Sequence, residues 1–205
     1  LLNPTSFRIG AGDRIGLVGR NGAGKTTLTK VLSGETLPTA GRVTRGGDVG
    51  YLPQDPRTGD LDVLGMDRIL SVRGLDEIVR SMRSTEGAMA SADDATRDAA
   101  MERYSRLEER FTAAGGYAAE SEAGRIASNL GLDERVLGQP LGTLSGGQRR
   151  RVELARILFS GADTLLLDEP TNHLDADSIV WLRDYLGSYA GGFLVISHDV
   201  GLVRQ

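Results

Sequence analysis

A glycine-rich segment directly after an apolar run constrains the fold of this 205-residue chain more than any other feature. Residues 19–27 read Gly-Arg-Asn-Gly-Ala-Gly-Lys-Thr-Thr and match the spacing G-x-x-x-x-G-K-[ST]. The apolar residues 15–18 before it predict a buried strand, and a helix is predicted to begin at Lys25. Glycines let backbone N–H groups converge on an anion without obstruction by Cβ atoms. The segment therefore predicts a strand, a phosphate-binding loop and a helix, and not an ordinary glycine-rich connection.

Two side chains at the end of this loop predict what it binds. Lys25 would bring a positive charge to the β and γ phosphates of a nucleotide, and the helix N-terminus would add its dipole. Thr26 would offer a hydroxyl oxygen to Mg²⁺, a cation that prefers oxygen ligands. A magnesium-bound polyphosphate is therefore the expected ligand.

Composition limits the possibilities further. The chain has a net charge of −4 and a pI of about 5.3, which does not indicate a surface built for nucleic acid. It has no cysteine, which excludes disulfides and thiolate metal sites. Because no apolar run approaches the ~18 residues that span a bilayer, we expect a soluble cytoplasmic protein with no direct membrane insertion.

The length of the chain fits one α/β domain with an insertion, and we expect residues 1–205 to form a single domain cut at both ends from a longer protein. Apolar runs separated by glycine and proline signals define its elements. Strands are predicted at residues 5–9, 13–18, 42–45, 48–52, 164–167 and 193–196, and helices at residues 25–33, 117–130, 149–159 and 177–189.

The middle of the chain, residues 61–132, has the composition of helices. Helices are predicted at residues 75–83 and 93–114, with a polar joint over residues 84–91. Charges of alternating sign on the second helix are typical of a solvated surface. Residues 75–114 therefore predict an inserted helical-hairpin arm, although periodicity alone allows a helical layer packed on the body equally well. Residues 115–162 would form a separate helical region.

The buried strand at residues 164–167 is followed directly by Asp168 and Glu169. A carboxylate at a strand end often only caps the next helix, but ligands of open α/β sheets bind at this end of the strands. In a chain with a phosphate-binding loop, Asp168 would hold Mg²⁺ and Glu169 would polarise the water that attacks the γ-phosphate.

Three further features are weak when taken singly. Residues 144–148 read Leu-Ser-Gly-Gly-Gln and precede a helix, so Ser145 and the backbone could bind an anion or could simply cap that helix. Gln54 and His198 each follow a predicted strand. A histidine in such a position is usually structural.

Taken together, the phosphate-binding loop, Gln54, residues 144–148, the Asp168-Glu169 pair and His198 resemble an ATP-binding-cassette (ABC) ATPase in order and rough spacing. The resemblance covers nearly all of the chain. It implies an α/β P-loop NTPase fold of ABC ATPase type, with a mixed sheet core, a helical subdomain and the inserted helical-hairpin arm. It also implies ATP and Mg²⁺ as cofactors.

The resemblance assigns roles to individual residues. The catalytic residues would be Gln54 of the Q-loop, Glu169 and the switch histidine His198, and the metal ligands would be Thr26, Gln54 and Asp168. ATP would contact the Walker A loop, the signature segment and the D-loop, namely Gly19, Asn21, Gly22, Ala23, Gly24, Lys25, Thr26, Thr27, Ser145, Gly146, Gly147, Gln148 and Asp175. In this family two cassettes enclose two ATP molecules, so a second cassette is an expected partner, in the same chain or as a homodimer.

Two features point to the ABC-F group, whose members have paired cassettes and often act on ribosomes. Residues 171–175 read Thr-Asn-His-Leu-Asp, where transporter cassettes more often have Ser-Ala-Leu-Asp. The interval between Gln54 and Leu144 is long enough for an arm, and residues 115–120 resemble the segment that follows it in ABC-F proteins. The resemblance thus implies the first cassette of an ABC-F protein, with the ribosome, its rRNA or tRNA as partner.

The arm itself does not look like an RNA-binding surface, since residues 75–114 contain nine acids and six arginines. Two other functions therefore stay open. One is the nucleotide-binding subunit of a membrane transporter, and the other is an ATP-gated clamp that scarcely hydrolyses ATP. The presence of Glu169 argues against the clamp.

Overall fold

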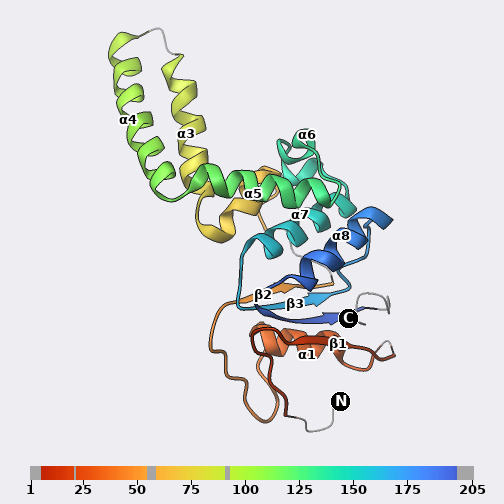
Figure 1. The fold of residues 1–205 in the computed structure, drawn as a ribbon. Coiled ribbons are helices and arrows are strands. Elements are labelled where there is room, and N and C mark those ends of the chain that lie inside the picture. Colours follow the sequence, from red (N-terminus) through yellow and green to blue (C-terminus); the bar gives the residue numbers. More distant parts are fainter. Residues whose placement is uncertain (1–5, 21, 55–58, 91–92, 198–205) are drawn as a thin grey trace.

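The computed structural model describes residues 6–20, 22–54, 59–90 and 93–197. Its centre is a four-stranded sheet in the order β1-β4-β3-β2, and every neighbouring pair is parallel (Figure 1). The strands are β1 (Arg14–Leu17), β2 (Val49–Leu52), β3 (Thr164–Asp168) and β4 (Gly192–Ile196). The two central strands are almost fully buried, as parallel strands covered on both faces must be.

Helices cover both faces of this sheet (Figure 1). Successive side chains of β3 point to opposite faces, so Leu166 packs toward α1 (Lys25–Ser33) while its neighbours Leu165 and Leu167 join the larger core. That larger core lies under α7 (Gly146–Phe159) and α8 (Ala176–Gly187). The sheet is therefore the middle layer of three, which confirms the α/β class.

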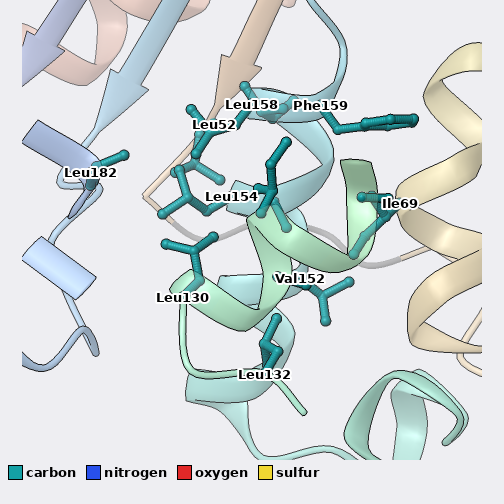
Figure 2. Packing of buried hydrophobic residues seen from close by; sticks show 14 of the residues in the cluster. Leu52, Ile69, Leu130, Leu132, Val152, Leu154, Leu158, Phe159 and Leu182 are labelled. Carbon is teal, nitrogen blue, oxygen red and sulfur yellow. The ribbon is translucent and has the colours of Figure 1, made fainter. Parts of the chain in front are cut away.

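A helical region continues the larger core away from the sheet. It comprises α2 (Gly65–Leu70), the 3-10 helix η1 (Ser71–Arg73), α5 (Gly116–Asn129), α6 (Glu134–Leu137), the 3-10 helix η2 (Leu141–Thr143) and α7. Figure 2 shows Leu158 and Leu154 of α7 in one cluster with Leu52 of the sheet and Leu130 at the end of α5. One apolar cluster thus joins the sheet to the helices, and α7 runs through its middle.

The sheet differs from prediction at two segments. Residues 6–9 and 42–45 are not strands, so the predicted mixed sheet has no antiparallel strand among the residues that the structure describes. For residues 42–45 the structure shows an alternative to strand pairing, since Arg45 donates hydrogen bonds to the carbonyls of Val31 and Leu32 at 2.8 Å each. These bonds hold the segment across the C-terminal turn of α1, where the last helical carbonyls need donors.

The arm is a helical hairpin of α3 (Asp76–Met89) and α4 (Asp94–Ala113), and it projects away from the sheet (Figure 1). Its two helices share a small core of their own around Met82, Leu107 and Phe111. The hairpin prediction is thus confirmed, and the alternative of a layer packed on the body is wrong. The polar joint predicted over residues 84–91 is also wrong in part, because α3 continues to Met89.

Two ion pairs with buried carboxylates lie at the base of this arm. Asp67 of α2 is 1% exposed and accepts two hydrogen bonds from Arg83 of α3, at 3.0 and 3.1 Å. The side-chain hydrogen bond to Asp67 raises the pKa of Arg83. The next residue, Arg68, pairs with the buried Glu153 of α7 at 2.5 Å. Charged contacts therefore connect α7 to α2 and α2 to the arm.

Replacing Arg83 by alanine should weaken the base of the arm by about 1–3 kcal/mol, because the buried Asp67 carboxylate loses the partner that satisfies it. Arg80→Ala is the matched control, since Arg80 lies on the same helix with similar exposure and pairs with Asp76 at i,i+4. A pair of that kind is worth only about 0.3–0.5 kcal/mol. Hydrogen exchange of the α3 amides measures the local opening free energy. Equal effects of the two substitutions on the opening free energy would contradict a special role for the Arg83–Asp67 pair.

Candidate nucleotide-binding site

The loop between β1 and α1 has the backbone that the glycine pattern predicts. Gly22 and Gly24 have φ values of 80° and 90°, a left-handed conformation that other residues rarely adopt. Gly24 is also the N-cap of α1, and among the described residues no side chain caps the amides of the first turn there. Such amides at a helix N-terminus form a ready site for an anion.

Lys25 folds back over this loop. Its Nζ atom donates hydrogen bonds to the carbonyls of Gly19 at 2.7 Å and Arg20 at 3.1 Å. The ammonium group therefore lies beside the loop, where its strongly hydrated point charge could bind a phosphate. Of the other predicted contacts in this loop, Ala23 and Thr27 are exposed, and Asn21 lies outside the described residues.

The structure brings together two of the predicted metal ligands. The Thr26 hydroxyl donates a hydrogen bond of 2.7 Å to Oδ2 of Asp168, although the two residues come from α1 and from the end of β3. The donor set fits Mg²⁺, because a hydroxyl and a carboxylate are hard oxygen ligands and Mg²⁺ usually takes few protein carboxylates beside water and phosphate. Thr26 and Asp168 would hold the ion.

Glu169 follows Asp168 in an unusual conformation. Its φ is 50°, and its N–H donates to the carbonyl of Ile196 on the neighbouring strand β4 at 2.8 Å. A left-handed backbone costs a residue with a side chain roughly 1–2 kcal/mol. Such strain is concentrated at functional sites, where the surrounding structure holds it in place. The conformation turns the chain sharply at the end of the strand, directly beside the Thr26–Asp168 contact.

Tyr51 lies in β2, the strand beside β3, and Gln54 follows the end of that strand. Burial raises the pKa of Tyr51, with a smaller contribution from the acids near it. Gln54 has an exposed side chain, and its carbonyl accepts a hydrogen bond from Arg150 at 2.8 Å. The structure therefore fixes the backbone of Gln54 near the end of β3, while its role as a metal ligand stays a prediction.

Residues 144–148 form the N-terminus of α7 in a capping box. The Ser145 hydroxyl accepts a hydrogen bond from the Gln148 N–H at 3.2 Å, and the Gln148 side chain accepts one from the Ser145 N–H at 2.8 Å. The helix-cap interpretation of this segment is therefore correct. It does not exclude anion binding, because Ser145 and Gly146 are exposed at the helix end.

Asp175 directly precedes α8, and His173, two residues before it, lies near Gly147 of α7. Asp175 caps α8 through the Ser178 N–H at 2.8 Å, and this backbone hydrogen bond is the main cause that lowers its pKa. A Cβ atom added at Gly147 would lie 3.4 Å from the Cβ of His173. The segment that precedes Asp175 therefore approaches the signature segment at Gly147. His198, the predicted switch residue, lies outside the described residues.

One residue of this site was missed by sequence reasoning. Arg150 is 6% exposed, and its guanidinium donates to backbone carbonyls that follow β2 and end β3. The only signal in the sequence was its place in the basic helix after residues 144–148. Nothing in that pattern distinguishes Arg150 from its neighbours Arg149 and Arg151.

Comparison with known proteins agrees with this geometry. A family model described as "ABC transporter" matches residues 2–172. The tylosin resistance ATP-binding protein TlrC of Streptomyces fradiae is 40% identical over 97% of this chain and 37% of its own length. The energy-dependent translational throttle protein EttA of Escherichia coli is 35% identical over 97% of this chain and 36% of its own length. The chain thus spans about a third of these relatives.

Solved structures give the same fold. The archaeal ribosome recycling factor aABCE1 has a TM-score of 0.61 and 27% identity, over 96% of this chain and 31% of that protein. A dimeric cassette of a bacterial ABC transporter has a TM-score of 0.62 over 97% of this chain and 80% of its own, at 20% identity. Within the described residues, no helix combines the length and apolar character needed to cross a membrane. The chain belongs to the ABC transporter family and is an ATP-binding-cassette ATPase domain that resembles a cassette of the ABC-F proteins.

Proposed function

We propose that this chain is the ATP-binding and ATP-hydrolysing cassette of an ABC-F type protein that acts on the ribosome, as a translation factor or a ribosome-protection protein. The observation that carries the ATPase proposal is the Thr26–Asp168 contact with Glu169 directly beside it. It supports ATP hydrolysis because Thr26, next to Lys25 of the phosphate-binding loop, contacts Asp168, and the candidate base follows Asp168 directly.

Different residues of the site would act on the phosphates, on the attacking water and on Mg²⁺ during phosphoryl transfer. Lys25 and the amides at the start of α1 bind the phosphates and neutralise charge that develops in the transition state. Glu169 accepts a hydrogen bond from water and orients it in line with the γ-phosphorus. As the water oxygen bonds to phosphorus, its proton passes to the Glu169 carboxylate and the bond from phosphorus to the β–γ bridging oxygen breaks, which yields ADP and phosphate. Mg²⁺, held by Thr26 and Asp168, would supply further charge neutralisation.

The exposed N-terminus of α7 supports a site shared between two cassettes. Leu144 is buried, whereas Ser145 and Gly146 that follow it are exposed. The first amides and the hydroxyl of this helix can therefore receive a phosphate from a second cassette. Together with Asp175, this segment would complete the site at Lys25 of its partner.

Two observations support the ribosome as the partner. Relatives that cover nearly the whole chain include a protein named as a translational throttle, and a solved structure of similar fold is a ribosome recycling factor. The projecting hairpin of α3 and α4 offers a surface for a large partner (Figure 1). Such a role would place the protein in the cytoplasm. The alternative is the nucleotide-binding subunit of a transporter, which the likeness to a transporter cassette favours.

Replacing Lys25 by alanine should reduce ATP affinity about ten- to hundredfold, because a charge-assisted contact of this kind is worth about 1.5–3 kcal/mol. Titration calorimetry with ATP measures the loss. Lys30→Ala, in the last turn of the same helix, is the control and should bind ATP normally. An unchanged affinity for Lys25→Ala would refute the phosphate-binding role of the loop.

The 205-residue chain alone should hydrolyse ATP slowly, since Ser145 would serve the nucleotide of a second cassette and not its own. Turnover per chain should rise with protein concentration as copies pair. Phosphate release across a dilution series tests this expectation, with Glu169→Gln as the blank. Turnover that is substantial and independent of concentration would show that one copy is sufficient.

Replacing Glu169 by glutamine, with the equivalent change in a second cassette, should preserve ATP binding and stall hydrolysis, because the amide loses the basic oxygen. If the ribosome is the partner, the full-length protein should then remain on ribosomes in ATP but not in ADP, and it should inhibit translation in vitro. Co-sedimentation with ribosomes provides the measurement. The control is Glu134→Gln, which changes an exposed acid on α6.

These results separate the two candidate functions. A Glu169→Gln protein that binds ATP but neither sediments with ribosomes nor inhibits translation would overturn the ribosome proposal and leave the ATPase proposal intact. In the transporter alternative, the same change would lock a membrane complex instead.

A further inference from the structure

A single buried side chain holds together the ends of two neighbouring strands. Nη1 of Arg150 donates to the carbonyls of Pro53 at 2.5 Å and Gln54 at 2.8 Å. Nη2 donates to the carbonyls of Asp168 at 2.5 Å and Glu169 at 3.1 Å. One guanidinium therefore contacts four carbonyls, two after β2 and two at the end of β3.

These contacts begin where the pairing of the strands stops. The ladder between β2 and β3 ends at Leu52 opposite Leu167. The next residue after β2 is Pro53, which has no N–H and cannot extend the ladder as a donor. Its carbonyl still requires a donor at this half-buried position. The guanidinium of Arg150 supplies donors directly beyond the end of the ladder, where Pro53 cannot act as one.

Arginine is suited to this position. Its planar fork of N–H donors fits several acceptors in a fixed arrangement, whereas lysine has one compact ammonium group on a flexible stem. A buried cation is costly to desolvate unless its donors are satisfied, so the observed geometry requires the carbonyls to stay in place. The carbonyl positions and the side chain therefore restrain each other.

The two residues that Arg150 restrains are those expected to act on the reacting groups. Gln54 is the predicted Q-loop ligand, and Glu169 is the candidate base. At its other end, Arg150 belongs to α7, two residues after Gln148 of the capping box. The helix that presents the signature to a second cassette is thus bonded to the backbone that carries Gln54 and Glu169.

We propose that Arg150 is a positioning residue for hydrolysis, which couples the N-terminus of α7 to the strand ends that carry Gln54 and Glu169. A nucleotide that shifts this end of α7 would shift the carbonyls of both residues through one side chain. The proposal rests on the ATPase function proposed above. It adds a physical link between two nucleotide sites: the one at Lys25 of this cassette, and the one in a second cassette to which the signature of this cassette would contribute.

The test compares Arg150→Lys and Arg150→Gln with Arg156→Lys in the full-length protein. Arg156 lies on the same helix and pairs with Glu153, away from the strand ends. Both changes at Arg150 should lower kcat about ten- to hundredfold, since a displacement near 1 Å can cost 10²-fold. The Kd for ATP should change less than about threefold, because Lys25 and its loop are untouched. Arg156→Lys should retain the native kcat.

Hydrogen exchange of residues 164–172 provides a readout that does not depend on activity. Arg150→Lys should speed exchange there, most of all at the Glu169 amide, and Arg156→Lys should not. If the native protein proves to be no ATPase, the function proposed above fails, while this measurement still tests the restraint. Native kcat and native exchange in Arg150→Lys would overturn the inference. So would parallel loss of ATP binding and hydrolysis in Arg150→Lys, since that pattern indicates a general structural role.

Discussion

The hydrogen bond between the Thr26 hydroxyl and the Asp168 carboxylate is the contact on which the rest of the site depends. It joins the first turn of α1 to the last residue of β3, and only β4 separates the strands β1 and β3 that lead to them. Parallel strands bring their carboxyl ends to one edge, so this topology lets residues far apart in sequence meet. Asp168 is 1% exposed, and a buried carboxylate requires a partner. The hydroxyl meets that requirement, and Mg²⁺ would bind the same two oxygens.

Local patterns were sufficient to predict the elements that build this edge. The phosphate-binding loop, the strand before Asp168 and the helix after the signature each follow from a short run of residues, because glycine conformation, burial and capping are local requirements. The hairpin could be distinguished from a helical layer packed on the body only in the structure, since its sequence periodicity fitted both arrangements equally well. Met82 of α3 faces Leu107 and Phe111 of α4 and not the body, and periodicity does not specify which surface an apolar face covers.

The parts that sequence reasoning missed depend on long-range hydrogen bonds from arginine. Arg45 donates hydrogen bonds to carbonyls at the end of α1. These bonds are found where a strand was predicted over residues 42–45. Arg150 looks like one of three equivalent arginines in the sequence, yet its neighbours serve other carbonyls. Arg149 donates to Leu144, and Arg151 donates to Gly131. A flexible side chain can reach many acceptors, so only the folded arrangement decides which carbonyls it binds.

Backbone strain is concentrated in the segment that follows β3 and carries the candidate base. Among the described residues, Glu169 and His173 are the two with a side chain and a positive φ, at 50° and 71°. Both lie in the segment between β3 and α8, where each costs about 1–2 kcal/mol. The sheet holds the first through the Ile196 carbonyl, and His173 packs against Gly147 of α7. The segment that begins with the candidate base is therefore held by the sheet at Glu169 and contacts α7 at His173. Arg150 also joins α7 to the sheet. The strained segment and the Arg150 guanidinium are therefore two separate connections between α7 and the sheet.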